Sequence, residues 1–136
     1  MAAIFGPQST ESSSAVQSTC GALEVPHIQT RWDYRVRPRM HTLNLYPPPN
    51  ALGSAYLQYV KEKNWKQFAI LYEQNDALIR LQELLKDPMI KQRPVVVRQF
   101  EEDNDYRKTL KELGRKGIKN FVVDVDTQNV HLLLKH

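Results

Sequence analysis

Short apolar runs alternate with helix-like segments along this chain of 136 residues. The pattern is typical of βαβ units, in which buried parallel strands are joined by amphipathic helices. The sequence therefore predicts an α/β fold with doubly wound, mainly parallel sheets. The expected strands are residues 3–5, 25–28, 68–72, 95–97 and 121–123, with a further apolar alternation at 43–46.

The expected helices lie between these runs. A hydroxyl-rich stretch, residues 8–14, suits a helix start, and residues 51–64 form the next helix. Asp76 is the expected cap of a helix that ends before Pro88. Asp105 and then Asp126 open the last two, and Gly114 or Gly117 ends the first of these. The expected buried positions of the first helix are Ala15, Val16, Thr19, Cys20 and Leu23.

Composition excludes several classes of protein. Apolar residues make up 41% and charged residues 25%, which argues against wholesale disorder. No apolar run approaches the roughly 20 residues of a membrane helix, and the first seven residues do not fit a signal peptide. Cys20 is the one cysteine, so an internal disulfide and cysteine-based metal sites are excluded.

No motif predicts catalysis. The four histidines share no metal-ligand spacing, and Cys20 has no visible base or orienting group. The acidic run at residues 101–105 does not match a calcium loop and is better explained as a loop that caps the next helix. We therefore expect no catalytic residue, metal or cofactor, and the chain is not expected to be an enzyme.

Two binding sites can be considered from the residues alone. Ser9 and Thr10 follow the Gly6-Pro7 turn and open a helix, where hydroxyls and backbone amides favour an anion. Simple helix capping by these side chains is the commoner explanation. A stand-alone soluble α/β protein that binds a small anion or an amino acid there is the alternative function.

The second site is a basic cluster with interleaved aromatic residues. Such a mixture can hold phosphates and stack bases, as in an RNA-contacting module. Asp33 interrupts the cluster and no nucleic-acid-binding motif supports it, so a solvated loop and no nucleic-acid partner are expected. Its members are Arg31, Trp32, Tyr34, Arg35, Arg37, Arg39 and His41.

Three segments, residues 3–7, 15–32 and 78–85, together resemble the amino-terminal domain of kainate-type ionotropic glutamate receptors. Leu45-Tyr46-Pro47 and Asn64-Trp65-Lys66 fit the same pattern. The resemblance implies a fragment of a bilobed clamshell with the periplasmic-binding-protein type I fold. It assigns residues 1–46 to part of lobe one, 47–66 to the crossing segment and its helix, and 67–136 to part of lobe two.

The resemblance also implies a function. The domain would lie at the extracellular face of the postsynaptic plasma membrane, in a glutamate-gated ion channel. There it would assemble with other receptor subunits as dimers and tetramers, with modulation as a further role. Agonist binding, the pore and the membrane segments would belong to other parts of the parent chain. The helix around residues 13–23 resembles one at the dimer interface, which makes Ser14, Gln17, Ser18 and Gly21 the interface candidates.

Ser9 and Thr10 match hydroxyl residues that hold an amino-acid carboxylate in related metabotropic receptors. The second hydroxyl patch of that pattern is replaced here by Arg31-Trp32-Asp33. This departure counts against amino-acid binding. The resemblance further implies that Cys20 is unpaired.

Overall fold

The computed structural model describes residues 2–34, 40–100 and 106–135, and Thr10 by its backbone only. It divides the chain into two compact units, Met1–Ala51 and Leu52–His136. Both contain a three-stranded parallel sheet, so the predicted α/β class is confirmed. The assignment of residues 1–46, 47–66 and 67–136 to lobe one, a crossing segment and lobe two stays a prediction. Among the described residues, no helix is both long enough and apolar enough to span a bilayer.

The first unit is a small sheet with one helix. Its elements are β1 (Ile4–Phe5), α1 (Thr10–Ala22), β2 (His27–Gln29) and β3 (Thr42–Asn44). The strand order is β1-β2-β3, and Ile4, His27 and Thr42 lie side by side in register. Because β2 is central, both of its neighbours bond to it.

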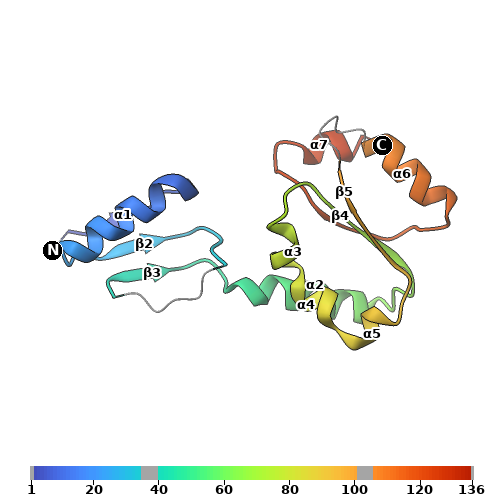
Figure 1. The fold of residues 1–136 in the computed structure, drawn as a ribbon, viewed down its shortest axis with the longest axis horizontal. Coiled ribbons are helices and arrows are strands. Elements are labelled where there is room, and N and C mark those ends of the chain that lie inside the picture. The colour runs from blue at the N-terminus through green and yellow to red at the C-terminus, as the bar shows by residue number, and fades with distance from the viewer. Residues whose placement is uncertain (1, 35–39, 101–105, 136) are drawn as a thin grey trace. The chain divides into compact units, whose positions relative to one another are not determined.

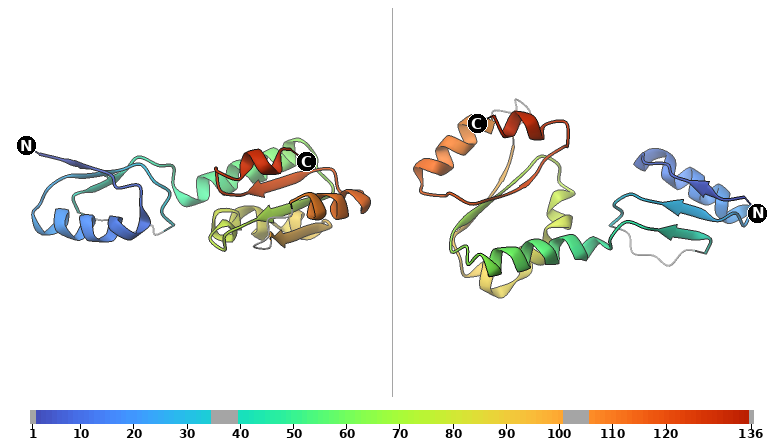
Figure 2. Two further views of the ribbon diagram at one scale, coloured as in Figure 1. Left: turned by 90° about the horizontal axis from the view of Figure 1, so that it is seen from above. Right: turned by 180° about the vertical axis from the view of Figure 1, so that it is seen from behind.

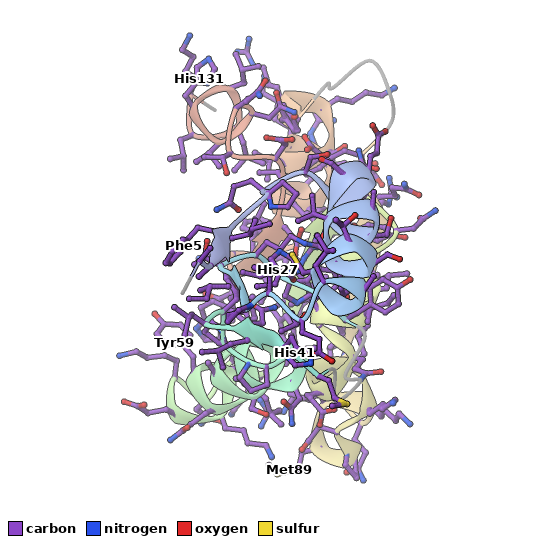
Figure 3. The ribbon with its side chains drawn as sticks, turned by 90° about the vertical axis from the view of Figure 1, so that its left-hand side faces the viewer. Phe5, His27, His41, Tyr59, Met89 and His131 are labelled. Atoms are coloured by element: carbon purple, nitrogen blue, oxygen red, sulfur yellow. The ribbon has the colours of Figure 1, made fainter. Side chains whose placement is uncertain are left out.

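The two faces of this sheet differ in cover. His27 and Gln29 are buried beneath α1, as is Cys20 on the helix. Phe5 and Leu43 lie in register with Ile28, the residue after His27, so their side chains occupy the opposite face of the sheet. There they are 74% and 58% exposed. Figure 2 shows α1 along one face of the sheet, and Figure 3 shows Phe5 directed away from that helix. The prediction that the first strand is buried is therefore wrong in this chain.

The buried stripe of α1 also differs from the predicted one. Ser13 and Cys20 are buried, and Val16 and Gln17 are half-buried. Ala15, Thr19 and Leu23 are exposed instead, Leu23 by 67%. The reason is that the sheet presents polar His27 and Gln29 to the helix, so a serine meets them better than a leucine does.

The second unit has the sheet order β5-β4-β6, all parallel. Its strands are β4 (Phe68–Tyr72), β5 (Val95–Gln99) and β6 (Phe121–Asp124). Four of the five residues of β4 are buried, as expected for a central parallel strand. The helices are α2 (Pro49–Glu62), which runs across the division of the units, α3 (Ala77–Arg80), α4 (Gln82–Lys86), α5 (Pro88–Lys91), α6 (Tyr106–Arg115) and α7 (Val130–Leu133).

Each face of this sheet has its own apolar core. One joins Phe68 and Ile70 of β4 to Val60 of α2 and Leu84 of α4. The other joins Ala69 and Leu71 to residues from α6 and from the loop that follows it, including Leu113 and Ile118. Helices on both faces make this unit doubly wound, as the alternating residues of β4 require.

Several predicted boundaries move. The helix expected from Asp76 is broken into α3 and α4, and Pro88, expected only as a stop, opens α5 at its first position. Gly114 lies inside α6, whereas Gly117 follows it with a φ of +81°. The amide of Ile118 then donates to the carbonyl of Leu113. Gly117 is thus the residue that ends α6. Asp105, its expected cap, lies outside the described residues.

Candidate functional site

The turn between β1 and α1 places the predicted anion site at the carboxyl edge of the first sheet. Gly6 has a φ of +86°, a conformation that favours glycine, and its amide donates to the carbonyl of Ile28 at 2.9 Å. Pro7 then directs the chain toward the start of α1. Ser9 is the residue that immediately precedes the helix.

The hydroxyl of Ser9 does not cap the helix. Ser9 has extended backbone angles, and its carbonyl accepts from the amide of Ser13 at 3.2 Å, but its side chain makes no capping hydrogen bond. Ser9 is exposed. The side chain of Thr10 lies outside the described residues. The capping explanation is therefore wrong for Ser9, and its hydroxyl is not committed to the helix.

Neighbouring polar residues at this edge are bonded to one another. The side-chain amide of Gln8 donates to the hydroxyl of Thr30 at 2.9 Å. Arg31 donates from Nε to the hydroxyl of Ser13 at 3.2 Å and lies 3.5 Å from the carboxylate of Asp33. Its side chain is only 14% exposed.

That position of Arg31 bears on the basic cluster. A guanidinium held by Ser13 and Asp33 is not part of a solvated phosphate-binding surface. Arg35, Arg37 and Arg39 lie outside the described residues. The rings of Trp32 and Tyr34 contact each other at 5.9 Å between centroids.

Sequence reasoning missed a buried polar layer between α1 and β2. The ring of His27 bonds through Nε2 to the carbonyl of Gly6, and its Nδ1 lies 3.4 Å from the amide nitrogen of Gln29. The side-chain nitrogen Nε2 of Gln29 also donates to the hydroxyl of Ser13 at 3.2 Å. The spacing of His27 and Gln29, two residues apart in a strand, is the signal that they share one face. These bonds fix which side of α1 faces outward.

The outward side of α1 carries most of the interface candidates. Ser14, Ser18 and Gly21 are exposed, and a side chain at Gly21 would meet no atom within 4 Å. Gln17 lies apart from them because it is half-buried and donates to the hydroxyl of Thr42 at 3.4 Å. Ser14, Ser18 and Gly21 follow the three- and four-residue spacing of a single helix face. They form a surface of short side chains, which a second helix can approach closely.

The carboxyl edge of the second sheet carries a polar network that the sequence did not predict. Glu73, just after β4, accepts hydrogen bonds from the hydroxyl of Tyr106, from the side chain of Asn129 at 3.0 Å and from the amide of Asp126 at 2.7 Å. Gln99 donates to the carbonyl of Glu73 at 2.8 Å. One carboxylate thus ties α6 and the segment before α7 to the central strand.

Arg80 is the centre of a second polar network at the same edge of the sheet. It donates to both carboxylate oxygens of Asp124 and to Asp76. The hydrogen bond that Arg80 donates to Asp124 is the largest cause that raises the pKa of Arg80 above its ordinary value. Asp76 precedes α3 but makes no capping bond there, contrary to prediction, because its carboxylate pairs with Arg80.

In the networks around Glu73 and Arg80, the polar side chains bond to one another. Within the residues that the structure describes, no three histidine, cysteine or acidic side chains are placed to hold a metal ion. Cys20 is buried and not in a disulfide. The second unit therefore shows a sheet edge held by internal hydrogen bonds, whereas the outward face of α1 carries short, exposed side chains.

Comparison with known proteins gives the family. A family described as receptor family ligand binding region matches residues 1–136. The chain is 45% identical over 125 residues to a Mus musculus protein, glutamate receptor ionotropic, kainate 1, which covers 90% of this chain and 15% of the relative. The proteins of the same name from Homo sapiens and Rattus norvegicus are 44% and 46% identical, over 90% and 93% of this chain and 14% and 13% of their own length.

The relatives are receptors by name, in line with the expectation that the chain is not an enzyme. The chain spans about one-seventh of the length of the curated relatives it matches, since it covers 13% to 15% of them. The predicted resemblance to kainate receptors is confirmed by these identities. The chain belongs to the receptor family ligand binding region family and is a homologue of part of the ionotropic kainate receptors.

Proposed function

We propose that this chain is part of the extracellular amino-terminal domain of a kainate-type glutamate receptor subunit. In this proposal it contributes to assembly with other receptor subunits, and the pore and the agonist site belong to other parts of the subunit. Kinship with receptors named kainate 1 supports this.

One observation carries the assembly role. The buried polar layer formed by Ser13, His27 and Gln29 holds α1 in a fixed rotation, so that Ser14, Ser18 and Gly21 face outward. Short side chains lose little conformational entropy when they are covered, and they let two helix backbones come close. The exposed Leu23 at the end of α1 adds apolar area to the same end of the helix.

The test is the self-association of this chain in solution. Sedimentation equilibrium should show a dimer, and Ser18→Arg should weaken it by about tenfold or more because a buried, unpaired charge opposes association. Ser54→Arg is the matched control, because Ser54 is an exposed serine on another helix, α2. If Ser18→Arg and Ser54→Arg have equal effects, or the chain stays monomeric, the proposed interface is wrong.

A second function rests on the hydroxyl of Ser9, which is exposed and does not cap α1. Together with Thr10 it would hold the carboxylate of an amino acid at the helix start. Glu11 lies in the first turn of the helix and opposes an anion there, so we rank this function second. Saturable calorimetric binding of L-glutamate, lost in Ser9→Ala and Thr10→Val, would reverse that order.

A further inference from the structure

A hollow of about 480 Å³ opens in the second unit where α6, β6 and α7 meet. It is lined by apolar side chains of all three elements and of the loop after α6, with Leu110, Ile118, Phe121, Val123 and Leu133 among them. Figure 1 shows α6 and α7 next to each other beyond the sheet. The hollow is within the size range of small-ligand sites, roughly 300–1,000 Å³.

A glycine of α6 helps to form it. Gly114, inside α6, lines the hollow without a side chain, and a side chain built there would meet no atom within 4 Å. Apolar atoms of the second core therefore border open space rather than other side chains.

The charges at the hollow have one sign. Arg107 and Lys111 lie one turn apart on α6, both are exposed, and both line the hollow. Neither forms an ion pair with another residue in the part of the chain that the structure describes. The lining contains no acidic residue, and Glu112 is already bonded by Arg98 and Lys116.

We propose that this hollow binds a small amphiphile with one aliphatic tail and one carboxylate. The tail contacts Leu110, Ile118 and Val123, and the carboxylate lies between Arg107 and Lys111. The lining disfavours a free inorganic anion, because apart from Arg107 and Lys111 the side chains around the ligand are apolar and donate no hydrogen bond. The two cations favour an acid over a neutral lipid of the same length. This site is separate from α1, so it stands or falls independently of the assembly role.

The test compares octanoate with octanol on this chain by methyl NMR. Octanoate should shift the methyl signals of Leu110, Ile118 and Leu133 in a saturable way. Arg107→Gln with Lys111→Gln should weaken octanoate binding by about tenfold or more and leave octanol binding unchanged. Arg115→Gln is the matched control, since Arg115 is an exposed cation of α6 outside the hollow and should not alter octanoate binding.

Gly114→Leu provides a second arm that does not depend on charge. The leucine would fill the hollow and favour the helix, so the chain should fold and lose both ligands. Circular dichroism of each variant confirms folding. The proposal is overturned if octanoate shifts no lining methyl group, if Arg115→Gln weakens binding as much as the double variant, or if folded Gly114→Leu binds octanoate as before.

Discussion

The guanidinium of Arg80 donates hydrogen bonds to both carboxylate oxygens of Asp124, with Nε 2.8 Å from Oδ2 and Nη2 2.7 Å from Oδ1. The two side chains are 18% and 16% exposed, so water screens the pair only partly. Arg80 ends α3 and Asp124 ends β6, so this contact joins a helix to an edge strand of the second sheet.

Arg80→Gln should lower the free energy of unfolding by roughly 1–3 kcal/mol, because Asp76 and Asp124 lose the cation between them. Urea unfolding measures the loss. Lys116→Gln is the control, because the Lys116–Glu112 pair is solvent-exposed and should change stability by about 0.5 kcal/mol or less. Equal losses in the two variants would show that Arg80 contributes no more than a surface pair.

Tyr106 should make the chain sensitive to alkali. Burial, followed by the hydrogen bond to Glu73, raises the pKa of its hydroxyl to about 12. In the unfolded chain this group loses its proton near pH 10. Its contribution is therefore complete below about pH 10 and is lost as the pH rises toward 12. Unfolding free energies at pH 8, 10 and 11 should fall less steeply in Tyr106→Phe than in the parent chain; parallel curves would contradict this origin.

Two glycines should respond in opposite directions to alanine. A side chain at Gly53 would lie 2.8 Å from the backbone oxygen of Arg80, so Gly53→Ala should destabilise by roughly 1–3 kcal/mol as α2 is pushed from α3. Gly114 meets nothing within 4 Å, so Gly114→Ala should stabilise by about 0.5–1 kcal/mol. Thermal unfolding distinguishes the two, and a stabilising Gly53→Ala would contradict the close helix approach.

Alanine substitution of two residues that precede helices, Asp87 and Ser9, should affect the stability of the chain differently. Asp87 accepts hydrogen bonds from the amides of Met89 and Ile90 and from Lys61, so Asp87→Ala should lower the urea midpoint. The hydroxyl of Ser9 makes no such bond, so Ser9→Ala should change stability by about 0.5 kcal/mol or less. A large loss in Ser9→Ala would show that its hydroxyl does cap α1.

Much of the fold follows from local sequence. Residues 68–72 are apolar throughout and form the central strand β4 with the predicted bounds. Gly117 ends α6 because few other residues adopt its backbone angles without strain. Cys20 is buried and free, as its place on the first helix and the lack of a second cysteine predicted. Each of these features depends on residues a few positions apart in the chain.

The candidate site was only partly predictable. The outward positions of Ser14, Ser18 and Gly21 agree with their assignment to an exposed face, whereas the role of that face stays a prediction. The buried layer of Ser13, His27 and Gln29 was missed because helix periodicity favoured Leu23 for the core. Strand β2 decides which stripe of α1 is covered, and its polar side chains select Ser13.

The sequence by itself determined the α/β alternation, the central strand and the family, and it limited the end of α6 to Gly114 or Gly117. Only the tertiary structure decided the partners of the polar groups. The residues around Asp76 predict that it caps a helix, yet its carboxylate pairs with Arg80. Arg80 also donates to Asp124, which lies 44 positions further along the chain. The parallel pairing of β4 with β6 brings Asp124 to that edge. The preference for a helix-capping hydrogen bond is small, about 1 kcal/mol, so ion pairs that strand pairing makes possible outweigh it.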